Sequence, residues 1–88
     1  MEREKRKRQD VVDEHGAELL FLSEEYFDGA IIGVTGKSQV AYDMDVMIDL
    51  FSRNNDCTYE EAVEYLEFNT WHAYVGEETP VFITRLSQ

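Results

Sequence analysis

The stretch AIIGVTGKSQVAYDMDVMIDLF, residues 30–51, decides the fold because its hydrophobic period changes partway along. The segment AIIGV (30–34) is β-branched and uncharged, which predicts a strand, and QVAY (39–42) resumes this extended character. Between them, TGKS (35–38) has turn composition, so the two strands are expected to form a hairpin. From Asp43 the apolar residues recur at helical spacing, and the Asp43 side chain can cap the helix start.

A second helix start follows in TYEE, residues 58–61, after RNND (53–56) ends the first helix. Thr58 and Glu61 have the T-x-x-E spacing of a capping box. Asn69 is expected to end this second helix. Its inward face is predicted to consist of Tyr59, Ala62, Val63 and Leu66, with Phe68 at its end. Its outward face is predicted to carry Glu60, Glu64 and Glu67.

The flanking segments complete the predicted order. PVFITRL (80–86) reads as a closing strand, with Pro80 at its first residue, where no ladder donor is needed. Residues 2–15 are polar nearly all round and favour a charged helix. The run AELLFL (17–22) is ambiguous between strand and helix, and residues 23–29 read as a connection.

These elements predict an α+β domain with a small antiparallel sheet, in the order β-β-α-α-β. Two helices are expected on one face of the sheet, together with the N-terminal charged helix. We divide the chain into a helical extension, residues 1–16, and a single domain, residues 17–88. A chain of 88 residues has room for one modest core.

The composition points to a cytoplasmic protein. No apolar run approaches the length of about 18 residues that a membrane-spanning helix needs, so no membrane partner is expected. The charged N-terminus lacks the apolar stretch of a signal peptide. A single cysteine, Cys57, excludes an internal disulfide framework.

The charge is distributed unevenly along the chain. EREKRKR (2–8) holds five of the eight basic residues, whereas residues 9–88 carry three basic and 17 acidic residues, a net charge of −14. A segment with this net charge repels nucleic acid and is suited to binding a basic protein surface, although acidity also keeps a small protein soluble. The basic segment reads equally as a nucleic-acid or membrane-surface arm and as a helix that complements the acidic body.

The motifs that resemble reactive sites are incomplete. GVTGKS (33–38) lacks a Walker A loop's first glycine, because Ile31 stands there, and a strand follows where a helix is required. The aspartates of DMDVMID (43–49) do not fit an EF-hand loop in either frame. Cys57, His15 and His72 form no catalytic or metal-ligand motif. The sequence therefore predicts a non-enzyme with no metal and no cofactor.

The blocks AIIGV, VAYDMDVMIDLF, TYEEAVEYLEFNT and AYVGEETPVFI resemble a group of small proteins encoded by bacteriophages and prophages. The likeness covers Phe27 to Ile83, and its last two blocks are the most specific. Trp71 and His72 stand where that pattern has smaller residues. The resemblance implies a phage origin, the β-β-α-α-β core and a location in the bacterial host's cytoplasm, but no biochemical activity.

The favoured interpretation is a non-catalytic phage protein that binds and inhibits or modulates a host protein by charge complementarity. The partner would be a defence or nucleic-acid-binding component with a basic surface. Two alternatives stay open. One is a small-ligand or nucleotide-sequestering protein, with contacts from TGKS and the loop 71–78, and the other is a homo-oligomeric structural or regulatory module. The predicted partner-binding residues are Glu60, Glu64, Glu67, Trp71, His72, Tyr74, Glu77 and Glu78.

Overall fold

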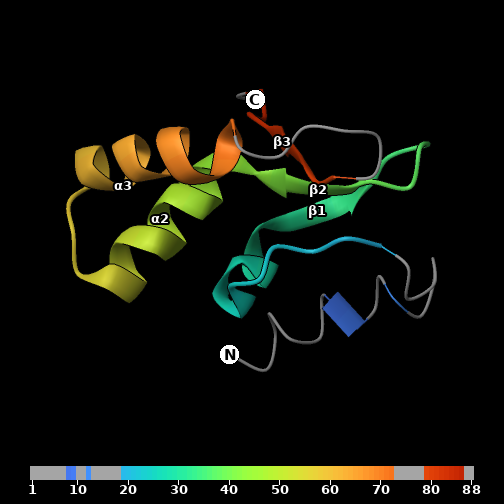
Figure 1. The fold of residues 1–88 in the computed structure, drawn as a ribbon, viewed down its shortest axis with the longest axis horizontal. Coiled ribbons are helices and arrows are strands. Elements are labelled where there is room, and N and C mark those ends of the chain that lie inside the picture. Colours follow the sequence, from blue (N-terminus) through green and yellow to red (C-terminus); the bar gives the residue numbers. More distant parts are fainter. Residues whose placement is uncertain (1–7, 10–11, 13–18, 73–78, 87–88) are drawn as a thin grey trace.

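The fold is an α+β arrangement, seen in a computed structural model that describes residues 8–9, 12, 19–72 and 79–86 (Figure 1). No helix in these ranges is long and apolar enough to cross a membrane. The elements in chain order are the 3₁₀ helix η1 (Glu25–Ala30), strands β1 (Ile31–Val34) and β2 (Val40–Asp43), helices α2 (Met44–Asn55) and α3 (Tyr59–Leu66), the π-helical segment η2 (Glu67–Trp71) and strand β3 (Val81–Ile83).

The predicted hairpin is confirmed. Strands β1 and β2 are antiparallel, with Val34 beside Val40 and a register shift between Ile31 and Gly33. The turn is closed by its own polar groups, since the Thr35 backbone N–H donates to the Gln39 carbonyl at 2.8 Å. Thr35 Oγ1 also accepts from the Lys37 and Gln39 backbone N–H groups. The turn chemistry of TGKS is therefore used within the hairpin.

The prediction of an antiparallel sheet is wrong for its third strand. Strand β3 pairs with β2 in parallel, with Ala41 beside Val81 and Asp43 beside Ile83, so the sheet is mixed and β2 is its centre. The helices α2 and α3 lie between these two strands in the chain, and such a helical crossover allows the chain to return to the start of β2. Gln39 Nε2 donates to the Thr79 carbonyl at 3.1 Å, which fixes the place where β3 begins.

Both helix starts are confirmed. Asp43 accepts hydrogen bonds from the Asp45 and Val46 backbone N–H groups at the start of α2. At the start of α3, Thr58 Oγ1 accepts from the Glu61 N–H at 3.1 Å, and Glu61 Oε1 accepts from the Thr58 N–H at 2.9 Å, which completes the capping box. Each cap satisfies backbone donors that a helix start otherwise leaves unpaired.

The expected helix stop at Asn69 is wrong. Helical geometry continues through η2 to Trp71, and Asn69 Nδ2 donates to the Tyr65 carbonyl at 3.0 Å. A π-helical turn is wider than an α-helical one, because its hydrogen bonds join residues five apart. This wider turn brings Trp71, five residues after Leu66, against the core. Thr70 is the buried residue of η2, and Trp71 beside it is partly buried.

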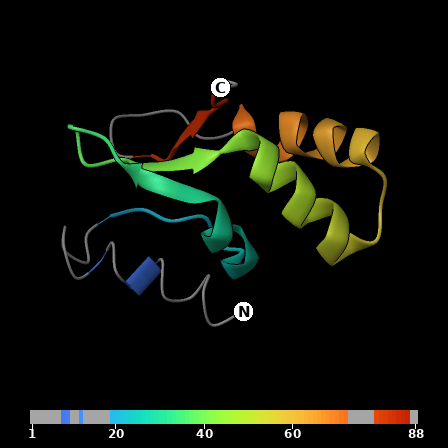
Figure 2. The ribbon, with the colours of Figure 1, turned by 180° about the vertical axis from the view of Figure 1, so that it is seen from behind.

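The two helices pack together, but they do not lie over a face of the sheet. Figures 1 and 2 show α2 and α3 beyond the end of the sheet where β2 ends, with α3 returning toward the strands. Helix α2 packs against η1 and α3. A continuous core joins strands and helices, and its fully buried members include Phe27, Val40, Tyr42, Met47, Ala62 and Leu66.

The N-terminal segment is attached to the domain by Arg8. Arg8, Gln9 and Val12 are helical, and the rest of the predicted N-terminal helix lies outside the described residues. The Arg8 guanidinium lies 2.7 Å from Asp28 Oδ1, and Asp28 is only 1% exposed. The Arg8 guanidinium also donates to the Leu22 carbonyl at 2.7 Å and lies over the Phe21 ring. For Arg8, charge complementarity within the chain is therefore the observed role.

Segments preceding β1 differ from the sequence-based expectation. Residues 19–22 of the ambiguous run AELLFL are neither helix nor strand. The predicted connection at residues 23–29 contains η1, whose Phe27 and Ala30 are buried. Leu22 is also buried, and its backbone N–H donates to Tyr42 Oη at 3.0 Å. This segment therefore contributes apolar side chains to the core without belonging to the sheet.

The burial of the Tyr42 phenol predicts a loss of stability at alkaline pH. Burial raises the pKa of Tyr42 from 10.0 to about 12. Because the phenol holds its proton to a higher pH in the folded chain, its contribution is complete below pH 10 and is lost as the pH rises toward 12. We expect a decrease of about 2–3 kcal/mol in the free energy of unfolding over this range.

The measurement is urea denaturation at several pH values between 9 and 12. Tyr42→Phe removes the titrating group, so its free energy of unfolding should be lower at pH 9 but should decline less with pH. The Leu22 N–H loses its acceptor in this variant, which accounts for the lower starting value. Equal declines for the wild type and Tyr42→Phe would contradict the assignment.

Candidate functional site

The outward face of α3 is the candidate site. The capping box fixes where the helix begins, and burial of Ala62 and Leu66 fixes its rotation. Glu60, Glu64 and Glu67 consequently point away from the core and are exposed, as the sequence predicts. They lie at i, i+4 and i+7, so they form one row along the helix surface. We call these three residues the acidic row.

Two aromatic residues, one in α3 and one in η2, are not where the sequence places them. Tyr59 is 60% exposed and Phe68 is 79% exposed, although both were expected on the inward face. Residues 58–61 are all exposed, so the first turn of α3 projects beyond the core. Phe68 follows Leu66 by two positions, which is about 200° around an α-helix. Helical spacing alone therefore predicts that Phe68 faces outward if Leu66 faces inward.

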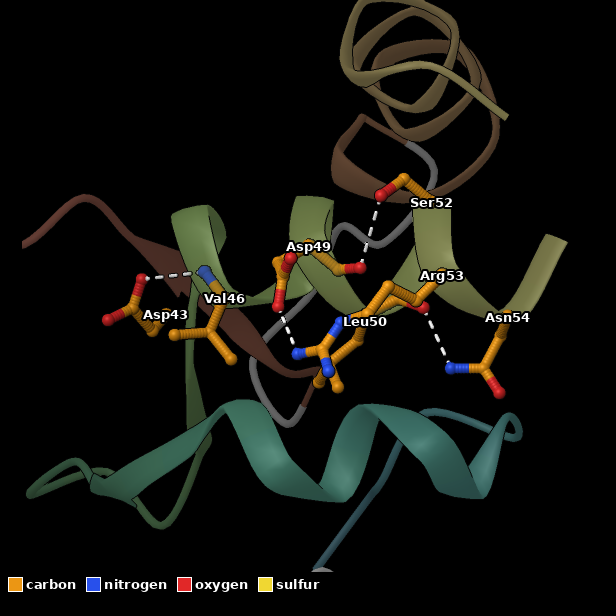
Figure 3. Close-up of polar contacts among 7 residues, drawn as sticks. All are labelled: Asp43, Val46, Asp49, Leu50, Ser52, Arg53 and Asn54. Atoms are coloured by element: carbon orange, nitrogen blue, oxygen red, sulfur yellow. Dashed lines mark hydrogen bonds and ion pairs between the residues drawn. The ribbon is translucent and has the colours of Figure 1, made fainter. Parts of the chain in front are cut away.

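The acidic row differs from two acidic residues at α2, Asp43 and Asp49, in having no partner. Figure 3 shows the polar contacts of α2, where Asp43 caps the helix and Asp49 pairs with Arg53. Within the described residues, no ion pair or hydrogen bond involves the side chains of the acidic row. By sequence alone, both sets are interpreted as acids on helix surfaces. Only the structure shows which of these carboxylates have a partner.

A shallow hollow of about 410 Å³ runs along one side of the acidic row. Tyr59 and Val63 supply apolar surface to it, while glutamate side chains supply carboxylates. A hollow with this lining can hold an organic cation that has an apolar stem, because both parts of such a group find a matching surface. The lining residues are Tyr59, Glu60, Glu61, Val63, Glu64 and Glu67.

The remaining predicted site residues differ from one another in their burial. Trp71 is partly buried and packs against the core, and its indole N–H is buried with no hydrogen-bond acceptor among the described residues. His72 is exposed. The structure thus separates the two neighbours that the sequence grouped. The other three predicted contacts lie outside the described residues: Tyr74, Glu77 and Glu78.

Cys57 lies in the short connection between α2 and α3. Partial burial raises the pKa of its thiol above 9.0, and the carboxylates of Glu61 and Asp56 act in the same direction. A helix N-terminus by itself lowers a thiol pKa, but burial and the two carboxylates outweigh this effect here. Because the thiolate is the nucleophilic form, this environment reduces its reactivity.

In the ranges that the structure describes, no three His, Cys, Asp or Glu side chains are placed to hold a metal ion. Comparison of the chain with known protein families, with curated proteins and with solved structures gave no match. The assignment of function therefore depends on the physical properties of the α3 surface.

Proposed function

We propose that this protein is a phage-encoded, non-catalytic protein that binds a basic surface on a host protein through the acidic row of α3. The observation that carries the proposal is the absence of any partner for the acidic row within the described chain. Three other acidic side chains have internal uses: Asp28 binds Arg8, Asp43 caps α2, and Asp49 pairs with Arg53. The acidic row is available to another molecule.

The arrangement of the acidic row also lowers helix stability. Glu64 lies four residues after Glu60 and three before Glu67, and like charges at these spacings repel each other. A basic partner would relieve this repulsion on binding. The repulsion thus supports binding as the role of this surface.

Charge complementarity supports a protein partner. Residues 9–88 carry a net charge of −14, so the body repels nucleic acid and attracts basic surfaces. Basic surfaces are typical of proteins that bind nucleic acid. We therefore propose a nucleic-acid-binding or defence component of the host as the partner, and inhibition or modulation of that component as the consequence. The phage origin and host cytoplasm rest on the sequence resemblance.

Glu64→Gln is expected to stabilise the isolated protein. It removes both like-charge pairs of the acidic row, each worth about 0.2–0.5 kcal/mol, so the free energy of unfolding should rise by about 0.4–1 kcal/mol at low salt. The gain should shrink in 1 M NaCl, where the Debye length is about 3 Å. Urea denaturation at both salt concentrations checks this. A less stable variant at low salt would show that Glu64 has a stabilising partner.

Binding is tested with two variants that remove the same amount of charge. The first, Glu60→Gln/Glu64→Gln/Glu67→Gln, neutralises the acidic row. The second, Glu24→Gln/Glu25→Gln/Asp45→Asn, neutralises three exposed acids elsewhere. Both are immobilised beside the wild type and exposed to nuclease-treated host lysate.

We expect the wild type and the second variant to capture the same basic protein at low salt, and the first variant to lose it. Capture by the wild type should weaken as the salt concentration increases, since exposed charges are screened. Undiminished capture by the first variant would contradict the proposal, because the total charge would then matter more than the acidic row.

A further inference from the structure

The hollow beside the acidic row identifies the type of side chain that the partner presents. We infer that it binds an arginine side chain of the partner protein, an inference that rests on the proposed function. The hollow combines an exposed phenol ring, the apolar Val63 and the carboxylates of the acidic row, which have no partner among the described residues. An arginine has a planar cation on an apolar stem, and each part matches one of these surfaces.

Tyr59 is the residue that favours arginine. Its side chain is 60% exposed at the start of α3 and lines the hollow beside Glu60. A guanidinium stacks on an aromatic ring and is more weakly hydrated than the ammonium group of lysine. The methylene stem can then lie on Val63 while carboxylates of the acidic row accept hydrogen bonds. Stacking against a guanidinium would give the exposed Tyr59 ring a function, since this ring does not pack in the core.

Other occupants of the hollow fit less well. The described residues offer no group of three ligands for a metal ion, and the walls of the hollow are partly apolar. An anion would be repelled by the acidic row. An uncharged apolar side chain would cover carboxylates without replacing their hydration, which is unfavourable. A cation with an apolar stem satisfies both surfaces.

The test uses three short peptides that differ only in their charged positions: two arginines, two lysines or two glutamines separated by glycine. Binding is followed by the amide chemical shifts of the isotope-labelled protein, which also show where each peptide binds. We expect the arginine peptide to bind most tightly, the lysine peptide less tightly and the glutamine peptide least. The shifts should be concentrated at residues 59–67.

Two alanine variants locate the contact. Tyr59→Ala removes the ring from the hollow, whereas Phe68→Ala removes an exposed ring of the adjoining η2 that does not line the hollow. We expect Tyr59→Ala to bind the arginine peptide about 2–5-fold more weakly and to lose the preference over lysine. Phe68→Ala should bind all three peptides like the wild type. Unchanged circular dichroism spectra show that both variants are folded.

The results separate this inference from the proposed function. An undiminished arginine preference in Tyr59→Ala, or an equal loss in Phe68→Ala, overturns the inference. In that case, loss of binding by the triple variant of the acidic row still supports the proposed function. If the triple variant binds the arginine peptide as well as Glu24→Gln/Glu25→Gln/Asp45→Asn does, the proposed function fails as well.

Discussion

Replacing Arg8 by alanine is expected to lower the free energy of unfolding by about 3–5 kcal/mol, because it breaks an ion pair with the buried Asp28 carboxylate. The guanidinium also donates to the Leu22 carbonyl, so a second buried polar group loses its partner. A domain of this size has a total stability of roughly 4–13 kcal/mol. The substitution therefore removes a large share of the stability, although Arg8 lies in the charged N-terminal segment.

The Arg53–Asp49 pair offers a matched control. Both side chains of this pair are exposed, and they are four residues apart on α2 (Figure 3). Arg53→Ala should cost at most about 0.5 kcal/mol, since exposed pairs of this kind contribute little. Urea denaturation followed by circular dichroism gives both values. Comparable losses for the two variants would mean that the burial of Asp28 carries no special cost.

A double substitution tests the reason for the loss at Arg8. Asp28→Asn removes the buried charge, so adding it to Arg8→Ala should restore part of the lost stability. Arg8→Ala/Asp28→Asn is therefore expected to be more stable than Arg8→Ala alone. If the double variant is less stable still, the lost stability comes from packing of the arginine stem rather than from the broken ion pair with Asp28.

The second large effect is expected at Leu66, the last residue of α3. Leu66 is fully buried in the core, so Leu66→Ala leaves a cavity and should cost about 2–5 kcal/mol. Alanine is an excellent helix former, so helix propensity does not add to this loss. The same denaturation measurement applies.

Phe68→Ala serves as the control for Leu66→Ala. Its ring is 79% exposed two residues further along, so the substitution should change the free energy of unfolding by no more than about 0.5 kcal/mol. A loss at Phe68 as large as that at Leu66 would show that the ring is covered in solution. A small loss at Leu66 would show that α3 contributes little to the core.

Much of the candidate site could be predicted from the sequence. The capping residues Thr58 and Glu61 define the start of α3, and helical spacing then places the acidic row outward. The prediction that Tyr59 and Phe68, at the two ends of the segment, lie on the inward face is wrong. Tyr59 is exposed because the core does not reach the first turn of α3, and no local pattern reveals how far a core extends.

Other features of the site needed three-dimensional contacts. Whether a carboxylate is engaged depends on which residues lie beside it, and Asp28 is paired with Arg8 across 20 positions of the chain. The acidic row differs from Asp28, Asp43 and Asp49 because the described structure gives it no such partner. The partial burial of Trp71 likewise depends on contact with the core, and it lies in the π-helical segment η2, which its local sequence does not indicate.

By itself, the sequence determined the β1–β2 hairpin, both helix starts and the outward direction of the acidic row. These features depend on residues within about five positions of one another, through turn chemistry, caps and helical periodicity. The tertiary structure alone decided the parallel direction of β3, the position of α2 and α3 beyond the end of the sheet, and the Arg8–Asp28 contact. Each of these joins segments distant in the chain, where the packing of the whole core selects the partner.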